Sequence, residues 1–211
     1  MSTITLALAK GRTAEDALKL LEKANITFPD FHKKSRRLVF YSHDQSIKMI
    51  YVKGVDVTTY VEQGAADIGI VGKDNILESG ADLYELLDLK FGLCKFVVAS
   101  LKDEAIKQGS VIKVASKYPN ITKRHFENRN ISVEPIQLNG SVELAPIIGM
   151  ADYIVDIVET GNTIKENGLT IIEDVEPIST RLIVNKASFA TKTNDIQAII
   201  EKLKDTINRE V

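Results

Sequence analysis

The sequence predicts an α/β protein with a parallel sheet, because short apolar runs alternate with amphipathic segments along almost all of its 211 residues. The clearest strand is Tyr153–Val158, in which four of six residues are β-branched. The clearest helix is Asp195–Asn208, where isoleucine and leucine recur every three or four positions. The length suits two lobes, and ligands of such folds bind beyond the carboxyl ends of the strands.

Each expected strand is an apolar run rich in β-branched or aromatic residues. In chain order, the expected strands are Leu6–Leu8, Leu38–Tyr41, Ile47–Val52, Ala66–Gly72 with a glycine turn at its end, Phe91–Ser100, Val111–Ala115, Val133–Ile136, Tyr153–Val158, Leu169–Ile172 and Arg181–Val184. Each expected helix has apolar residues three or four positions apart or lies between a turn and a glycine. The expected helices are Thr13–Lys23, Val57–Gln63, Asp74–Glu78, Asn120–Asn128, Val142–Ile147, Ile164–Asn167 and Asp195–Asn208.

Composition and charge argue against several classes of protein. Hydrophobic residues make up 44% and charged residues 27%, as in ordinary globular proteins. The net charge of −2 argues against a general nucleic-acid binder, and no apolar run approaches the length of a membrane span. Met1 leads directly into a strand-like segment, so no signal peptide is expected. The single Cys94 cannot form an internal disulfide, and we therefore expect a cytoplasmic location.

A phosphate-binding turn is predicted directly after the strand Tyr153–Val158. Glu159 ends this strand, and Thr160–Thr163 leads into a short helix. A Thr/Gly turn at a helix N-terminus presents free backbone N–H groups to an anion. Asp156 and Glu159 lie where carboxylates accept hydrogen bonds from sugar hydroxyls or hold Mg²⁺. Phosphate, ribose and metal together indicate a phosphoribosyl group, although the same turn also occurs as a plain connection in α/β proteins.

Two further strings suit a polyphosphate ligand. Lys10, Gly11 and Arg12 place two cations beside a glycine where the first helix begins. Small residues in the string Gly64–Asp74 allow the backbone to approach a ligand closely. Taken singly, basic residues in such loops are more often solvated surface charges.

These strings belong to a larger set of motifs whose order and spacing hold over nearly the whole chain. The motifs are Leu8–Arg12, Tyr60–Asp74, Ala115–Thr122, Leu138–Pro146, Ala151–Thr163 and Arg181–Asn185. Together they resemble ATP phosphoribosyltransferase, the family that opens histidine biosynthesis. The resemblance implies transfer of the 5-phosphoribosyl group of PRPP to N1 of ATP, with release of pyrophosphate and a requirement for Mg²⁺.

The resemblance also implies a two-lobed fold like that of the type II periplasmic binding proteins, with the active site in the cleft between the lobes. Residues 1–93 and 179–211 would form the first lobe, and residues 94–178 the second, which carries the PRPP-binding loop. The family has a long form with a histidine-binding domain and a short form without it. This chain resembles the short form, with no C-terminal regulatory domain. That form works with a regulatory subunit resembling histidyl-tRNA synthetase in a hetero-octamer.

The implied reaction depends on positioning two anionic substrates and on stabilising pyrophosphate, since adenine N1 carries a lone pair and does not first require deprotonation. The three histidines carry no triad signature and are not needed. The resemblance and the turn together give the expected PRPP-binding residues, which are Asp156, Glu159, Thr160, Gly161, Asn162 and Thr163. Mg²⁺ is expected on the substrate phosphates, with Asp156 and Glu159 as candidate ligands.

Basic residues are expected to bind pyrophosphate and the ATP phosphates. The catalytic candidates are Lys10, Arg12, Arg36 and Lys53. Lys53 stands where many family members have arginine, so a point charge replaces a bidentate fork. The ATP-binding candidates are Lys10, Gly11, Gly72, Lys73, Lys117 and Glu143. For Glu143 the other reading is a helix cap or a carboxylate that complements the helix dipole.

Two other functions remain open for the sequence. A two-lobed solute-binding module without chemistry would use the same fold, because fold does not fix function. Such receptors are exported, and they have no need of an acidic pair beside a phosphate turn. A phosphoribosyltransferase for another base is the second alternative.

Overall fold

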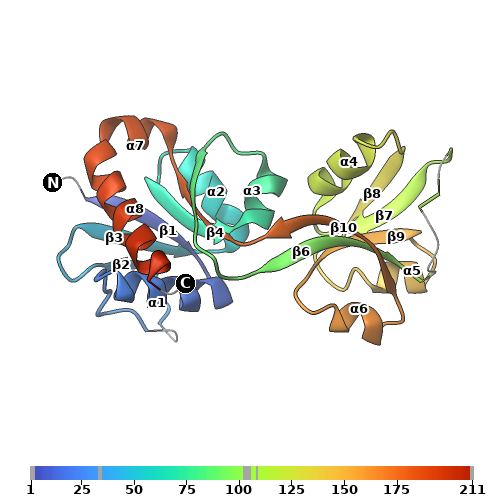
Figure 1. The fold of residues 1–211 in the computed structure, drawn as a ribbon, viewed down its shortest axis with the longest axis horizontal. Helices are drawn as coiled ribbons and strands as arrows, with labels where there is room; N and C mark the ends of the chain where they lie inside the picture. Colours follow the sequence, from blue (N-terminus) through green and yellow to red (C-terminus); the bar gives the residue numbers. More distant parts are fainter. Residues whose placement is uncertain (1–2, 33–34, 102–105, 108, 210–211) are drawn as a thin grey trace. The chain divides into compact units, whose positions relative to one another are not determined.

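The computed structural model describes residues 3–32, 35–101, 106–107 and 109–209 and divides the chain into two compact units (Figure 1). Unit 1 comprises residues 1–92 and 179–211, and unit 2 comprises residues 93–178. The chain therefore leaves unit 1 once, completes unit 2, and returns. Each unit has its own sheet.

The sheet of unit 1 has six strands in the order β2-β3-β1-β4-β11-β5. The strands of unit 1 are β1 (Ile4–Ala9), β2 (Val39–Tyr41), β3 (Ile47–Val52), β4 (Ile68–Gly72), β5 (Tyr84–Asp88) and β11 (Thr180–Val184). The three central strands β3, β1 and β4 are parallel, whereas β2, β11 and β5 pair antiparallel with their neighbours. The carboxyl ends of the parallel strands therefore meet at one edge of the sheet.

Helices cover both faces of this sheet because β1 is apolar on both sides. The helices of unit 1 are α1 (Arg12–Lys23), α2 (Gly54–Glu62), α3 (Lys73–Ser79), α7 (Lys186–Thr191) and α8 (Thr193–Asn208). Leu6 and Leu8 are buried in one core with the apolar sides of α1 and α8. Ala7 and Ala9 point to the other core, where they pack with Val57 of α2. Alternate residues of one strand thus serve two cores.

A buried carboxylate connects three elements of unit 1. Asp67, just before β4, accepts hydrogen bonds from the Thr5 N–H at 2.8 Å, the Ser188 Oγ at 2.7 Å and the Lys192 Nζ at 2.9 Å. Burial alone would raise the pKa of Asp67, but the hydrogen bonds from Thr5, Lys192 and Ser188 outweigh it, and the pKa lies below its ordinary value. Asp67 therefore joins β1 to α7 and the start of α8.

Unit 2 contains a five-stranded sheet in the order β10-β6-β9-β7-β8. Its elements are β6 (Cys94–Ser100), β7 (Ile112–Ser116), α4 (Pro119–Glu127), β8 (Val133–Gln137), α5 (Leu144–Ile147), β9 (Tyr153–Val158), α6 (Asn162–Glu166) and β10 (Thr170–Ile178). Strands β8, β7 and β9 are parallel, and β6 and β10 pair antiparallel with their neighbours. Val142, Ala145 and Ile164 pack with β6, β7 and β9 on one face of the sheet.

Most expected elements are confirmed, but some bounds differ: β6 begins at Cys94 and not at Phe91, and β10 extends to Ile178, six residues beyond the expected Ile172. Three further corrections concern strand direction, one turn and two elements. The sheets are mixed and not purely parallel, because β2, β5, β6, β10 and β11 run against neighbours. Gly69–Gly72 is part of strand β4 and not a turn, since Gly69 pairs with Ala7 and Ile183. Strand β5 and helix α7 were not expected from the sequence. No helix among the described residues is long and apolar enough to cross a bilayer.

Candidate functional site

The carboxyl ends of the three parallel strands of unit 2 form one candidate site. Ser116 ends β7, and it pairs with Val155 of β9 and with Gln137 of β8. Its buried hydroxyl donates to the Val155 carbonyl at 2.7 Å and accepts the Tyr118 N–H at 2.9 Å. Ser116 thereby links the ends of β7 and β9 directly before Lys117.

A cavity of about 280 Å³ lies past the end of β9. Its lining residues are Glu143, Asp156, Ile157, Val158, Glu159, Thr160, Gly161, Asn162, Thr163 and Ile164. Gly161 precedes α6 with φ 77° and ψ 7°, in the left-handed region that favours glycine. Because α6 has only five residues, its first N–H groups act as individual donors and no long helix dipole adds to them. The cavity thus brings backbone donors and carboxylates together.

Asp156 is a partly buried carboxylate that lines this cavity. Burial raises the pKa of Asp156 above its ordinary value, and the nearby Glu143 carboxylate raises it further. The Ile157 N–H, which donates to Asp156 Oδ1 at 2.8 Å, and the Lys117 ammonium act in the opposite direction. Two carboxylates that repel each other beside a cation form a site suited to hydroxyl groups or to a ligand-borne cation.

The structure brings several of the expected residues of unit 2 together. Asp156 and Glu143 line the cavity with the loop Glu159–Thr163, and Lys117 is close enough to shift the pKa of Asp156. The Lys117 ammonium lies 5.5 Å from the centre of the Tyr118 ring, a cation–π distance that holds it at the end of β7. Helix α5 begins at Leu144, two residues after the expected Val142, and Glu143 directly precedes it. The Glu143 side chain makes no capping hydrogen bond and lines the cavity instead.

The expected residues of unit 1 gather at the corresponding edge of its own sheet. Lys10, Lys53 and Lys73 each follow one of the neighbouring parallel strands β1, β3 and β4. The Lys10 N–H donates to the Val52 carbonyl at 2.8 Å, which fixes Lys10 next to Lys53 along the edge. The Lys10 ammonium lies 5.4 Å from the centre of the Tyr51 ring.

Glycine and arginine positions at this edge follow from the backbone. Gly11 has φ 97° and lets the chain turn from β1 into α1, which begins at Arg12. Helix α2 begins at Gly54, three residues before its expected start, so Lys53 directly precedes a helix. Arg36 is exposed and lies in the segment that leads into β2, whose Leu38 carbonyl accepts the Tyr51 N–H at 2.8 Å. The segment with Arg36 therefore approaches the edge where β3 ends.

One residue of the site was not expected from the sequence, and the expected metal has no site made of protein ligands alone among the described residues. The sequence provided no signal for Ser116, because a serine at a strand end resembles any other polar residue. Among the described residues, no three His, Cys, Asp or Glu side chains come together as a metal-binding group. The acidic oxygen donors of the cavity fit a Mg²⁺ that takes most of its ligands from substrate phosphates, not one held by protein alone.

Comparisons with known proteins identify the family of the chain. The family model HisG, ATP phosphoribosyltransferase, matches residues 53–205. The chain belongs to the ATP phosphoribosyltransferase family. A relative named ATP phosphoribosyltransferase from Oceanobacillus iheyensis is 56% identical over 207 residues, which cover 98% of this chain and 100% of the relative. A relative of the same name from Clostridium novyi is 49% identical over 211 residues, covering 99% of this chain and 100% of the relative.

Solved structures identify the fold of this family member. The ATP phosphoribosyl transferase (HisG:HisZ) complex from Thermotoga maritima contains a chain that is 36% identical, with a TM-score of 0.85 and 99% coverage of both chains. The periplasmic aliphatic sulphonate binding protein SsuA from Escherichia coli has a TM-score of 0.60 at 14% identity, covering 98% of this chain and 73% of that one. The second likeness shows the fold alone, and it confirms the expected type II periplasmic-binding-protein architecture.

Proposed function

We propose that this chain is the catalytic subunit that transfers the 5-phosphoribosyl group of PRPP to N1 of ATP, the first step of histidine biosynthesis. Membership of the ATP phosphoribosyltransferase family supports the reaction. The proposed binding of PRPP is supported by one observation: the loop Glu159–Thr163 and Asp156 line the same cavity. The reaction forms a bond from adenine N1 to ribose C1 and breaks the bond from C1 to the pyrophosphate oxygen.

The loop Thr160–Thr163 binds the 5′-phosphate of PRPP in this proposal. The left-handed backbone at Gly161 turns the chain into α6, and the first N–H groups of this helix are the proposed backbone donors. The hydroxyls of Thr160 and Thr163 add side-chain donors, and Asn162 adds an amide. A phosphate with three acceptor oxygens can use all of these donors at once.

Asp156 and Glu159 accept hydrogen bonds from the ribose hydroxyls. As the bond to pyrophosphate breaks, positive charge develops on the ribose ring, and a nearby carboxylate stabilises it more than it stabilises the ground state. The raised pKa of Asp156 reflects the cost of holding that charge in a half-buried position before substrate binds. Lys117 offsets part of this cost.

The cations at the edge of unit 1 take the phosphates of ATP and the departing pyrophosphate. Lys10, Arg12 and Lys53 are the main candidates, with Gly11, Gly72, Lys73 and Arg36 beside them. Mg²⁺, when bound to the substrate phosphates, neutralises part of their charge, and Asp156 and Glu159 are its candidate protein ligands. Positioning and charge stabilisation account for catalysis without a side chain acting as nucleophile.

In this proposal the chain is a short form of the family and works with a regulatory partner. Support comes from its match to a chain of a HisG:HisZ complex over 99% of both chains. We propose a partner resembling histidyl-tRNA synthetase, a hetero-octameric assembly, and histidine feedback through that partner. The single Cys94 supports a cytoplasmic location, which fractionation of cells would test.

An activity assay tests the function directly. The chain is incubated with ATP, PRPP and Mg²⁺, with and without the partner, and the N1-ribosylated adduct is measured. Turnover of ATP supports the proposal, whereas turnover with a free base alone identifies another transferase, and solute binding without turnover identifies a receptor. Inhibition by histidine in the absence of any partner contradicts the short-form assignment.

A further inference from the structure

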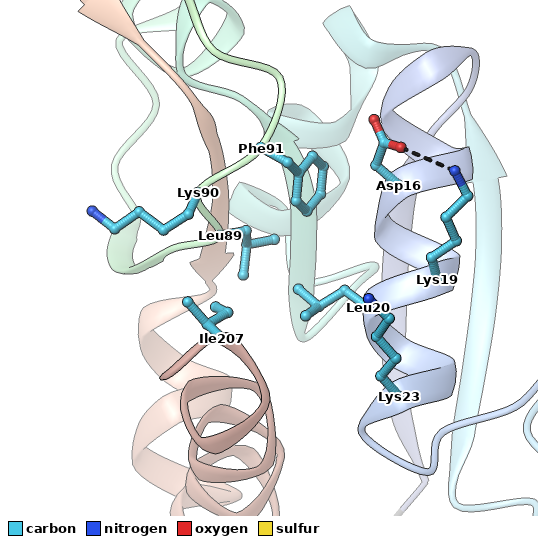
Figure 2. A pocket seen from close by; sticks show the side chains of 8 residues that line it. All are labelled: Asp16, Lys19, Leu20, Lys23, Leu89, Lys90, Phe91 and Ile207. Carbon is cyan, nitrogen blue, oxygen red and sulfur yellow. Dashed lines mark ion pairs between the residues drawn. The ribbon is translucent and has the colours of Figure 1, made fainter. Parts of the chain in front are cut away.

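A cavity of about 320 Å³ lies in unit 1, apart from every residue assigned to the transfer reaction (Figure 2). It is bounded by α1, by the end of α8 and by the segment Leu89–Phe91 that follows β5. None of the candidate residues for PRPP or ATP lines it. The proposed transfer therefore leaves this cavity without a role.

The floor of the cavity is apolar. Leu20, Leu89 and Ile207 form it, and all three belong to the core between α1 and α8. Phe91 is partly buried and packs against the same core. Figure 2 shows the side chains of Leu20, Leu89, Phe91 and Ile207 turned toward one another across the cavity. An apolar group placed here loses contact with water at no cost in buried polar atoms.

One wall of the cavity is cationic. Lys19 and Lys23 of α1 line it together with Asp16. Lys19 Nζ lies 3.5 Å from Asp16 Oδ1, but its side chain is 71% exposed, so the ion pair is weak and Lys19 can turn to another anion. Lys23 lines the same cavity as Leu20 (Figure 2). Lys90, by contrast, pairs with Asp88 Oδ2 at 3.0 Å and points away from the cavity.

We propose that this cavity binds a small organic anion with an apolar body. Its carboxylate or phosphonate group contacts Lys19 and Lys23, and its ring or branched chain packs on Leu20, Leu89 and Ile207. The volume is near the lower end for ligand pockets, which limits the apolar body to about one ring. A fully polar anion leaves the apolar floor in contact with water, and a neutral apolar molecule gains no attraction from the two ammonium groups. The cavity therefore favours a ligand that has both an anionic group and an apolar body.

The cavity wall is hydrogen-bonded to the returning chain. The Leu89 N–H donates to the Thr180 carbonyl at 3.0 Å, and the Thr180 N–H donates to the Phe91 carbonyl at 2.9 Å. Gly92 follows with φ 64°, and a Cβ there would lie 2.8 Å from Thr180 Oγ1. A ligand that contacts Leu89 and Phe91 therefore touches the segment through which the chain leaves unit 1, and this segment is hydrogen-bonded to the one through which it returns.

Amide chemical shifts of the full-length chain test this proposal. Phenylacetate, 4-methylpentanoate and benzylphosphonate are titrated separately, with acetate and phenylacetamide as probes that lack the apolar body or the charge. We expect saturable shifts at Leu20, Leu89, Phe91 and Ile207 with at least one of the three amphipathic anions, and weaker or no binding of both control probes. Binding of phenylacetamide as tightly as phenylacetate, or no saturable shift with any of the three anions, overturns the proposal.

Two matched double variants assign the anion contact to α1. Lys19→Gln with Lys23→Gln removes the cationic wall and should weaken binding about three- to tenfold, as expected for exposed charge contacts. Lys123→Gln with Lys95→Gln removes the same net charge from exposed ion pairs of unit 2 and should leave the affinity unchanged. Equal affinity in the two double variants, with unchanged melting temperatures, contradicts the proposed site.

Discussion

Replacing Gly161 by alanine separates backbone strain from loss of phosphate binding, because the chain contains a matched control. Gly161 and Gly168 flank α6 with φ values of 77° and 75°. A Cβ at either position costs about 1–2 kcal/mol in that region of backbone conformation. At Gly161 the added Cβ would also lie 3.3 Å from Ile171 Cδ1, which is the movable end of a side chain, whereas at Gly168 it meets nothing within 4 Å.

The two variants should therefore lose similar stability and differ in substrate binding. Only Gly161 lies in the loop that lines the cavity. In Gly161→Ala the loop relaxes to relieve the strain, which turns its N–H groups away from the phosphate. Loss of one charge-assisted hydrogen bond costs about 1.5–3 kcal/mol and should therefore raise the KM for PRPP by about tenfold or more. Gly168→Ala should keep the wild-type KM.

Initial rates with varied PRPP at saturating ATP, together with thermal unfolding of each variant, provide the measurement. If both variants show the same KM for PRPP, or if only Gly168→Ala is impaired, the loop is not the phosphate site. If Gly161→Ala raises the KM for ATP alone, the cavity binds the other substrate.

Three further predictions follow from single side chains. Asp67→Asn should lower the free energy of unfolding by about 2–4 kcal/mol at pH 7, because it weakens the contacts of a buried charge. Since the pKa of Asp67 is lowered in the folded state, the difference from wild type should shrink as the pH falls through about 4 and below. A difference that does not depend on pH, measured by chemical denaturation, would contradict the reasoning. Asp156→Asn should raise the free energy of unfolding by about 0.5–2 kcal/mol at neutral pH, since burial disfavours the charged carboxylate. The same variant should lower kcat/KM for PRPP. A lower melting temperature than that of the wild type would refute this account. Lys53→Gln should lower kcat/KM at least tenfold if Lys53 binds a phosphate. Lys53→Arg, which supplies a bidentate guanidinium, should retain or increase kcat/KM. Equal rates for the wild type and Lys53→Gln would show that Lys53 is not part of the site.

Local sequence patterns predicted the strands and the loop better than they predicted strand direction. Ile47–Val52 and Tyr153–Val158 are strands over the expected residues, because both are rich in β-branched and aromatic residues, which favour strands. An apolar sequence does not reveal strand direction, however. A buried strand such as β6 is apolar whether its neighbours run parallel or antiparallel to it. Strand β5 was missed because its outer residues are exposed and its apolar run is short.

The candidate site shows the same division between local and long-range information. The turn after Tyr153–Val158 and its acidic residues are local features, so the sequence was sufficient to predict them. The partners of Asp67 were not predictable in this way, because Lys192 lies 125 residues further along the chain. The proximity of Asp156 to Glu143 and Lys117 likewise depends on the order of three strands, which no motif contains.

The pairing of β6 with β10 makes unit 2 an inserted domain whose two ends are neighbours. Cys94, near its start, pairs with Ile178 at its end, so excising residues 93–178 leaves both new termini side by side. Domains with adjacent termini and their own core tolerate transfer between chains. A recombinant fragment of residues 93–178 should therefore fold alone, and calorimetry on it would report the affinity of the loop for ribose 5-phosphate free of any contribution from nucleotide.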